Sequence, residues 1–563
     1  MRFFDWEIAG FDRDSAVEFC RNGVNPLVAV FLTARGFTAI EDIKSYMSDT
    51  ASAIYDPMLL ADMDKAVERI TFAMENRQRI AIYGDYDVDG VTASALLADY
   101  FRAKGADFEV YIPHRINEGY GLNRQAIDDL KSRGVALIVT VDCGVTALEE
   151  AEYVRELGLG LVITDHHQCR DTLPVADAVV DPQRPDCRYP NDALAGVGVA
   201  FKLVCALEGE GSEDAMFRQY GDLVALGTVA DVMPVTGENR VLIRRGLRVL
   251  ENSQRTGLRQ LTRDACTSSG KIGTACVGFV LAPRLNAAGR MGKTNVSLEL
   301  LLTKDANEAD LLVDELTTLN AERRELENEI YENALSLIGS EAPEGPIVLA
   351  SRSWYQGVTG IVAAKMSDRY FLPAIMISVD EDGIGRGSCR SFGPFGIISA
   401  LTACQDLLIS YGGHEMAAGV TIAESDIDEF RRRINEYYRD NIKSMPKPQL
   451  KLDFEVEKPE ILTVTNVEAL GGLEPFGNGN PPPCLCIKGA VVSEIIPVGA
   501  GKHTRLKIEK SGKALDCIYF SMPPDELDVK KGELCDIAFE PQINEFRGRI
   551  TVQLQVFDIK RSV

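Results

Sequence analysis

The most informative segment of this chain reads Ile80-Ala81-Ile82-Tyr83-Gly84-Asp85-Tyr86-Asp87-Val88-Asp89-Gly90. Its apolar first half is typical of a buried strand, and residues 91–101 are expected to continue as a helix. Three carboxylates, those of Asp85, Asp87 and Asp89, stand at alternate positions where the strand would end. Because alternate residues of an extended segment face the same way, these carboxylates can converge. A raised pKa or a bound cation would relieve their repulsion, so the segment is a candidate metal site.

Short apolar runs alternate with helical segments over the next hundred residues. The runs occupy positions 80–83, 108–112, 135–141, 159–164 and 178–180. This alternation predicts a parallel sheet with helices on both faces. In such sheets, ligands bind at the carboxyl ends of the strands.

Further acidic and histidine residues follow other apolar segments. Asp142 follows one predicted strand, the triplet Asp165-His166-His167 follows another, and Asp231 comes after a later apolar segment. Each acid taken alone can be explained as a helix cap. Two adjacent histidines are harder to explain by packing, since the chain has only five histidines. Together these residues suggest a site for hard divalent metal ions.

The α/β multidomain pattern divides into five predicted parts. They are an N-terminal helical segment (1–75), a catalytic domain built on the parallel sheet (76–303), a connecting helix (304–338), a second α/β domain (346–441) and a C-terminal β-barrel resembling an OB-fold (450–563). The connecting helix is predicted because 304–338 contains no Gly or Pro and keeps helical apolar spacing. It would be roughly 50 Å long at about 1.5 Å per residue. The barrel is predicted from period-two alternation near residues 550–556.

The composition limits which cellular location and which binding partners are expected for this protein. The chain has 563 residues, thirteen cysteines and a net charge of −24. No apolar run reaches the length of about eighteen residues that a membrane span needs, so no membrane partner is expected. The cysteines are scattered and their total is odd, which favours reduced thiols and a cytoplasmic location over a disulfide framework. The negative charge counts modestly against a nucleic-acid substrate, although bound metal ions can invert the field inside a site.

The four acidic motifs, taken in order, resemble the DHH phosphoesterase superfamily, whose namesake triplet is Asp165-His166-His167. Other matching segments are P-H-R at 113–115 with E-G-Y-G-L at 118–122, A-P-R-L-N-A-A-G-R-M at 282–291, G-G-H-E-M-A-A-G at 412–419 and P-F-G-N-G-N-P at 475–481. They are similar to the single-strand-specific 5′→3′ DNA exonucleases of that superfamily over nearly the whole chain. One departure is Tyr355, which stands where relatives often have His.

The resemblance implies a set of site residues around two Mn²⁺ or Mg²⁺ ions. The implied ligands are Asp87, Asp89, Asp142, His166 and Asp231, with Asp142 bridging and Asp85 either a ligand or a supporting acid. His167 would face the scissile phosphate, and Asp165 would orient its neighbours. Arg284, Ser388 and Arg390 would hold the terminal 5′ phosphate, Arg115 would supply another phosphate contact, and Asn286 and His414 would lie along the substrate path.

The implied function is metal-dependent hydrolysis of single-stranded DNA from the 5′ end, in DNA repair and recombination. The implied domains are a DHH domain, a DHHA1-type domain and an OB-like barrel. A helicase and a single-strand-binding protein are expected as further partners, and the chain is expected to be a monomer. One alternative is a DHH phosphodiesterase acting on short oligonucleotides or small nucleotides. Another is a non-enzymatic scaffold, although every ligand position is occupied here.

Overall fold

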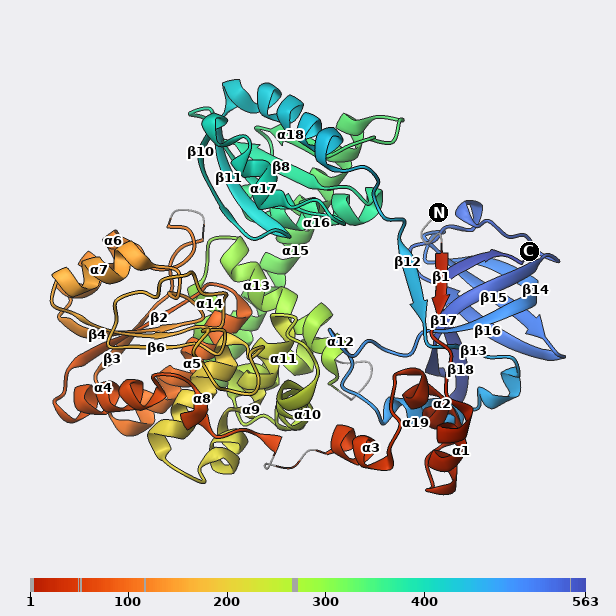
Figure 1. Cartoon of the computed structure of the whole chain (residues 1–563), viewed down its shortest axis with the longest axis horizontal. Helices are drawn as coiled ribbons and strands as arrows, with labels where there is room; N and C mark the ends of the chain where they lie inside the picture. Colours follow the sequence, from red (N-terminus) through yellow and green to blue (C-terminus); the bar gives the residue numbers. More distant parts are fainter. Residues whose placement is uncertain are drawn as a thin grey trace. The chain divides into compact units, whose positions relative to one another are not determined.

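The computed structural model describes residues 5–48, 50, 53–115, 118–265, 272–546 and 548–562. The chain divides into two compact units: Met1–Asp49 joins Lys447–Val563 in one, and Thr50–Pro446 forms the other (Figure 1). The predicted N-terminal segment 1–75 is therefore divided between the two units. Helices α1 (Arg13–Arg21), α2 (Pro26–Ala34) and α3 (Ile40–Met47) belong to the first unit, and α4 (Met63–Glu75) belongs to the second.

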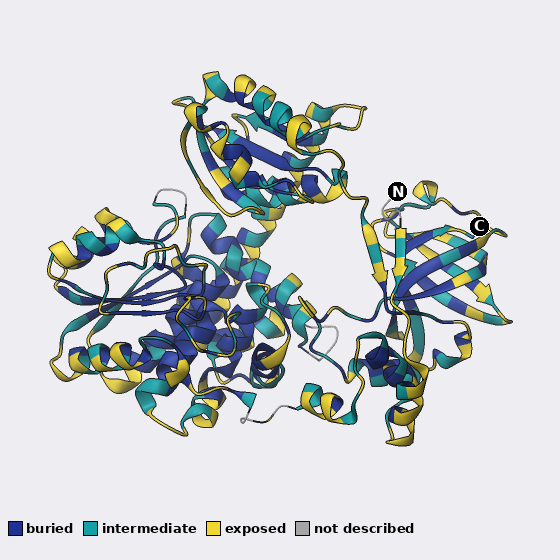
Figure 2. Ribbon diagram, viewed as in Figure 1, coloured by how far each residue is buried: buried dark blue, intermediate teal, exposed yellow. Residues whose placement is uncertain are grey.

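The second unit contains the predicted parallel sheet, which is confirmed. Its strands are β2 (Arg79–Gly84), β3 (Phe108–Tyr111), β4 (Val135–Val141), β5 (Gly160–Thr164) and β6 (Ala178–Val180), in the order β3-β2-β4-β5-β6. All four strand pairings are parallel. Figure 2 shows the buried residues concentrated along this sheet and the helices beside it.

Helices cover both faces of the sheet. On one face lie α4, α5 (Val88–Lys104) and α8 (Gly196–Glu208), and on the other lie α6 (Arg124–Ser132) and α7 (Leu148–Glu156). Asp87 caps α5 by accepting hydrogen bonds from the backbone N–H groups of Asp89 and Gly90, at 2.9 and 3.2 Å. The helix ends at Gly105, which adopts the left-handed conformation that glycine tolerates.

A helical layer completes this domain. It comprises α9 (Glu213–Ala230), α10 (Gly237–Glu251), α11 (Thr256–Ala265), α12 (Thr274–Cys276), the π-helix η3 (Val277–Leu281), α13 (Ala282–Arg290) and α14 (Asn295–Leu302). The connecting helix α15 (Ala306–Ile338) follows as predicted, capped by Asp305. Among the described residues, none of the helices combines the length and apolar character that a membrane crossing requires.

The second α/β domain places a mainly antiparallel sheet after α15. Its elements are β7 (Ile347–Ser351), α16 (Gln356–Tyr370), β8 (Ala374–Val379), β9 (Ile384–Arg390), α17 (Ile397–Thr402), β10 (Leu408–Gly413), β11 (Ala417–Ala423) and α18 (Ile427–Asn441). The strand order is β10-β11-β9-β8-β7, and only the β7–β8 pair is parallel among these described strands.

The other unit contains the predicted barrel. Strands β14 (Leu485–Val498), β15 (His503–Lys510), β16 (Lys513–Tyr519), β18 (Arg549–Arg561) and β17 (Leu534–Phe546) are adjacent in that order, and β17 pairs back onto β14 to close the sheet. The short strand β13 (Phe454–Glu455) extends one edge, and α19 (Val464–Gly471) packs with α2 on the same core. Strand β1 (Asp5–Ile8) pairs with β12 (Gln449–Leu452) and joins the two ends of the unit.

The cysteines of the described residues are mostly free thiols, which agrees with the expectation of no disulfide framework. Cys276, at the end of α12, is an exception because it is disulfide-bonded.

Candidate active site

The strand-end acids and histidines converge at the carboxyl edge of the parallel sheet. Three groups have ligand atoms within 4.8 Å of one another: Asp85, Asp87 and Asp142; Asp89, His166 and Asp231; and Asp142, His166 and His167. Nε2 of His166 lies 3.0 Å from Asp142, 3.5 Å from Asp231 and 3.7 Å from Asp89. The sequence-predicted ligands therefore form one continuous cluster.

Local backbone features hold these side chains in place. Asp142 directly follows β4 with a φ of 60°, a strained conformation for a residue other than glycine. Gly196, the first residue of α8, packs against it: a Cβ atom there would lie 2.6 Å from the Cβ atom of Asp142. Gly90 is needed for a similar reason, because its Cβ atom would lie 2.6 Å from the backbone nitrogen of Asp85.

The cluster brings together several buried carboxyl groups that repel one another when they are ionised. Burial, followed by the charge of neighbouring carboxylates, raises the pKa of Asp89 to about 7 and that of Asp231 to about 9. The same two causes raise the pKa values of Asp85 and Asp142 well above the usual range. Among the described residues, no Lys or Arg forms an ion pair with these four carboxylates. A polyvalent cation would supply the missing positive charge.

The donor set fits hard divalent cations. Buried oxygens of Asp85 and Asp231 and the Nε2 atom of His166 have no hydrogen-bond partner. Burial, then the charge of His167, lowers the pKa of His166 to about 4, so its imidazole is neutral and able to act as a ligand. Carboxylate oxygens together with one imidazole suit Mn²⁺, and the oxygens alone suit Mg²⁺.

Asp165 and His167 form a separate pair beside the cluster. The Asp165 carboxylate accepts hydrogen bonds from the backbone N–H of Val145 at 2.9 Å and from Nδ1 of His167 at 2.8 Å. Burial opposes ionisation of Asp165, but the bond from His167 and its charge hold the pKa below its usual value. Burial likewise opposes protonation of His167, yet Asp165 raises its pKa to about 9. The pair is therefore carboxylate and imidazolium.

Tyr120 is a site residue that the sequence analysis did not single out. Its hydroxyl lies 3.2 Å from Nδ1 of His167 and 3.3 Å from the backbone oxygen of Asp142. The sequence feature that could have identified Tyr120 is its place in the E-G-Y-G-L segment.

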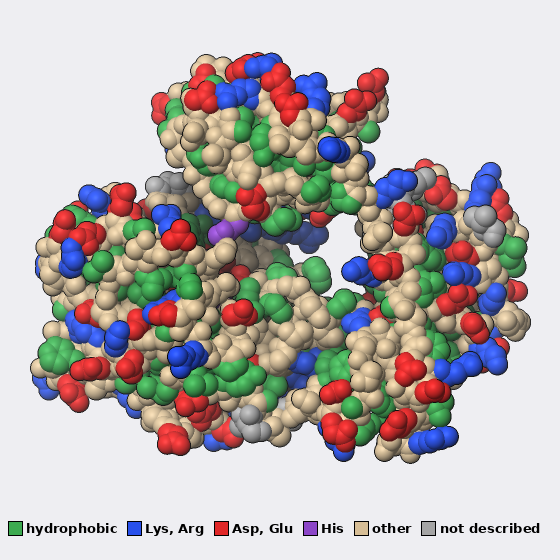
Figure 3. Space-filling view, viewed as in Figure 1, with side chains coloured by type: hydrophobic (Ala, Val, Ile, Leu, Met, Phe, Trp, Pro, Cys, Tyr) green, Lys and Arg blue, Asp and Glu red, His purple; other side chains and the backbone are tan. Residues whose placement is uncertain are grey.

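A cavity of about 610 Å³ adjoins these groups, between the catalytic domain and the second α/β domain. Tyr86, Arg115 and Tyr120 line it from the former. The latter contributes mainly residues of β9, β10 and β11, namely Arg386, Gly387, Ser388, Ser410, Tyr411, Gly412, Gly419, Val420 and Thr421. Figure 3 shows histidine side chains at the hollow between these two domains. Of the predicted phosphate-side residues, Arg115 and Ser388 line this cavity.

Two facing glycines interrupt the side chains that line the cavity from β10 and β11. Gly412 and Gly419 face each other across β10 and β11, and a Cβ atom at either position would meet nothing within 4 Å. Ser388 is the next residue across the sheet from Gly419. Glycine weakens a strand interior and often marks a place where a ligand approaches closely. The bare sheet face is therefore a candidate surface for substrate.

Arginines gather beside the cavity. Arg390 lies at the end of β9, and its electrostatic neighbours include Arg115. Arg290, which the sequence analysis did not select, ends α13: burial, then the charges of Arg115 and Arg323, lowers its pKa to about 9. Arg323, a neighbour of Arg290, pairs with Glu327 at 2.7 Å, and its buried Nε atom has no acceptor. Clustered guanidinium groups with free donors fit a phosphate, which they can bind in bidentate fashion.

The other predicted residues occupy different places. Asn286 accepts a hydrogen bond from the backbone N–H of Val88 at 3.2 Å, so it touches the start of α5 beside the acids. Arg284 donates to the backbone oxygen of Val280 in η3, at 2.8 Å. His414 lies exposed in the turn between β10 and β11 and does not line the cavity. Tyr355 precedes α16, with its ring against Gly357.

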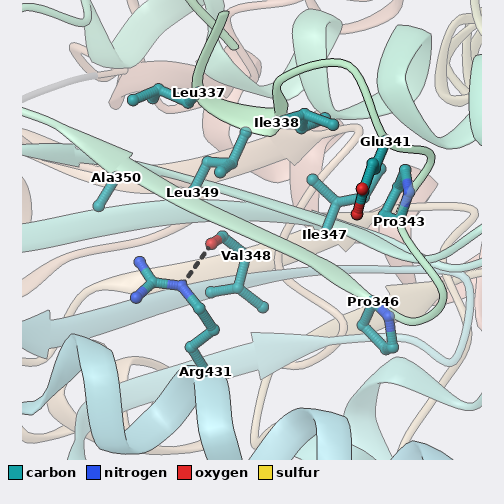
Figure 4. A pocket seen from close by; sticks show the side chains of 10 residues that line it. All are labelled: Leu337, Ile338, Glu341, Pro343, Pro346, Ile347, Val348, Leu349, Ala350 and Arg431. Carbon is teal, nitrogen blue, oxygen red and sulfur yellow. Dashed lines mark hydrogen bonds between the residues drawn. The ribbon is translucent and has the colours of Figure 1, made fainter. Parts of the chain in front are cut away.

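A second cavity, of about 430 Å³, lies between the end of α15 and the edge strand β7 (Figure 4). Its lining is largely apolar and includes none of the predicted site residues. Nε of Arg431 donates to the backbone oxygen of Val348 at 2.8 Å and so occupies part of the free strand edge. Of these two cavities, the larger one is therefore the cavity that belongs to the candidate site.

The fold and site together define the class of this protein. The DHH family, N-terminal domain, matches residues 79–228, and the DHHA1 domain matches residues 344–440. The chain is thus of the DHH type, with a strand-edge acid and histidine cluster facing a DHHA1 sheet. The RecJ OB domain matches residues 452–558, which contain the barrel.

Comparison with individual relatives shows which family of DHH proteins this chain belongs to. The single-stranded-DNA-specific exonuclease RecJ of Bacillus subtilis is 37% identical over 560 residues, covering 98% of this chain and 70% of that protein. The Escherichia coli protein of the same name is 32% identical, covering 95% and 96%. The crystal structure of RecJ in complex with Mn²⁺ from Thermus thermophilus matches with a TM-score of 0.83 and 30% identity, covering 99% of this chain and 80% of that one. The chain belongs to the RecJ family.

Proposed function

We propose that this protein is a metal-dependent exonuclease that degrades single-stranded DNA in the 5′→3′ direction by hydrolysing phosphodiester bonds. The observation that carries the proposal is the cluster of buried carboxylates and one neutral imidazole, which forms no ion pair with a lysine or arginine among the described residues. Relatives support it, since the B. subtilis and E. coli proteins are named single-stranded-DNA-specific exonucleases. The T. thermophilus relative has been crystallised with Mn²⁺ and with Mg²⁺.

Two Mn²⁺ or Mg²⁺ ions fit the ligand groups. Asp85, Asp87 and Asp142 would hold one ion, and Asp89, His166 and Asp231 would hold the other. Asp142 would bridge, because its Oδ1 atom lies 3.0 Å from His166 of the second group. When bound, such a pair activates water near neutral pH and stabilises the attacking and leaving oxygens of the phosphodiester.

The neighbouring residues would then handle the substrate. Asp165 fixes Nδ1 of His167, which leaves the other ring nitrogen free to contact the scissile phosphate. Arg284, Ser388 and Arg390 would hold the terminal 5′ phosphate, and the buried Arg290 adds positive charge there. Arg115 would contact phosphate from the opposite wall of the cavity. Asn286 and His414 would adjoin the strand.

The biological setting is part of the same proposal. The OB barrel would bind single-stranded DNA through stacking and backbone charge. A monomeric cytoplasmic enzyme acting in DNA repair and recombination would receive its substrate from a helicase and a single-strand-binding protein. The five predicted domain ranges remain our proposed division of the chain.

Digestion of end-labelled DNA tests this function. With Mn²⁺, the wild type should release the label of a 5′-labelled single strand as a nucleotide in its first cleavage, and it should leave a duplex intact. Asp142→Ala should abolish cleavage with an unchanged circular dichroism spectrum, whereas Asp128→Ala, a surface substitution, should retain it. Faster cleavage of a dinucleotide than of the long strand would favour the small-substrate phosphodiesterase. Full activity of Asp142→Ala would refute the metal site.

A further inference from the structure

The segment 191–197, which leads into α8, contacts the cluster of proposed metal ligands. The backbone N–H groups of Gly196 and Val197 donate to the two oxygens of Asp89, at 2.6 and 2.9 Å. These are the free donors of a helix N-terminus, and they stabilise a carboxylate there. They also fix the orientation of the Asp89 carboxylate.

The same segment contacts two more of the proposed ligands. The backbone of Leu194 lies within hydrogen-bonding reach of His166. Gly196 packs on Asp142 so closely that even a methyl group would overlap that side chain. A small shift of 191–197 would therefore move the ligands of both proposed ions together.

Two residues of α10 anchor this segment. Nδ2 of Asn239 donates to the backbone oxygen of Ala193 at 2.5 Å. Nδ2 of Asn191 donates to the side-chain oxygen of Asn239 at 3.0 Å and to Glu238 at 3.3 Å. Glu238 and Asn239 are buried, so water does not replace these bonds.

The Glu238 carboxylate is itself held from several directions. It accepts from Nζ of Lys202 at 2.7 Å, from the hydroxyl of Tyr189 at 2.9 Å and from the backbone N–H of Tyr55 at 2.9 Å. The side chains of Lys202 and Glu238 are both fully buried. A fully satisfied buried network of this kind is rigid, and it joins three distant chain segments to α10.

We propose that Glu238 and Asn239 are positioning residues for the metal centre, acting through segment 191–197. The inference deepens the proposed function and rests on it. Stability alone is a weaker explanation, since a buried ion pair often adds little net stability over apolar packing. Residues that orient metal ligands from behind typically change metal affinity by about 10- to 100-fold when they are altered.

Metal binding to the full chain tests the inference without using activity. Asn239→Leu keeps the branched skeleton of the side chain and removes the donor to Ala193. We expect it to raise the Mn²⁺ dissociation constant at least about tenfold, measured by the electron paramagnetic resonance signal of free Mn²⁺. The matched control is Ser253→Ala, which removes a buried 2.6 Å hydrogen bond to Asp222 in the same helical layer. It should leave Mn²⁺ affinity within about twofold.

Each outcome has a definite meaning. Equal Mn²⁺ affinities for Asn239→Leu, Ser253→Ala and the wild type would overturn the positioning role while leaving the proposed function intact. A wild type that binds no Mn²⁺ would overturn both. If Asn239→Leu does not fold, the partly buried loop substitution Asn191→Ala takes its place, with the same expected loss and the same result against it.

Discussion

Replacing Asp89 by Asn should inactivate the protein and, at the same time, stabilise its metal-free form. The Asp89 side chain is 1% exposed, and burial with the charge of Asp87 raises its pKa from 3.8 to about 7. A tenfold change in proton affinity corresponds to about 1.4 kcal/mol, so the ionised carboxylate costs about 4 kcal/mol above pH 7. Asparagine carries no charge and escapes this cost.

The Asp89→Asn substitution also removes one hydrogen-bond acceptor. The carboxylate accepts from two backbone N–H groups through two oxygens, whereas an amide offers one oxygen. A buried donor left without its acceptor costs about 1–3 kcal/mol. The net gain in unfolding free energy for Asp89→Asn is therefore about 2 kcal/mol at pH 8 without metal.

The pH dependence has a definite sign. Because the folded pKa of Asp89 exceeds its unfolded value, the stability that the neutral carboxyl provides is complete below about pH 4 and is lost as the pH rises through 7. Asp231 extends the loss toward pH 9. In EDTA, the wild type should lose stability from pH 4 to 9, and Asp89→Asn should lose less.

Urea unfolding followed by circular dichroism measures these changes, in EDTA and in Mn²⁺. Mn²⁺ should stabilise the wild type and have little effect on Asp89→Asn. Asp222→Asn is the control, because Asp222 is similarly buried but paired with Arg255, so this variant should be destabilised with or without metal. An Asp89→Asn variant that is less stable than the wild type in EDTA at pH 8 would show that the cluster is not strained by its charge.

Two further substitutions test the residues that are proposed to contact the substrate. Arg284→Ala should weaken the preference for a 5′-phosphorylated strand about tenfold, measured as the ratio of cleavage rates with and without the phosphate; an unchanged ratio would remove Arg284 from the proposed anchor. Gly419→Val should leave stability unchanged or raise it by up to about 1 kcal/mol, since valine favours strands and its Cβ atom meets nothing within 4 Å, yet it should block most cleavage of single-stranded DNA by extending into the cavity. Full activity of Gly419→Val would show that substrate does not use this face.

The sequence alone determined the parts of this protein that depend on local pattern. Apolar runs and turns predicted the parallel sheet, and the acids that follow those runs lie together at its carboxyl edge. The absence of Gly and Pro predicted the connecting helix, which runs from Ala306 to Ile338. Period-two alternation predicted the barrel. In each case the backbone period fixes which side chains share a face, so neighbouring residues carry the information.

Only the tertiary structure decided which distant residues support the site. Glu238 and Asn239 look like an ordinary polar first turn of a helix, and Arg290 looks like a helix-ending charge, until folding buries them. The first 49 residues likewise join the C-terminal unit through the pairing of β1 with β12, which no local pattern predicts. Hydrogen bonds between residues far apart in the chain leave no periodic trace in a sequence, because their partners are chosen by packing and not by spacing along the chain.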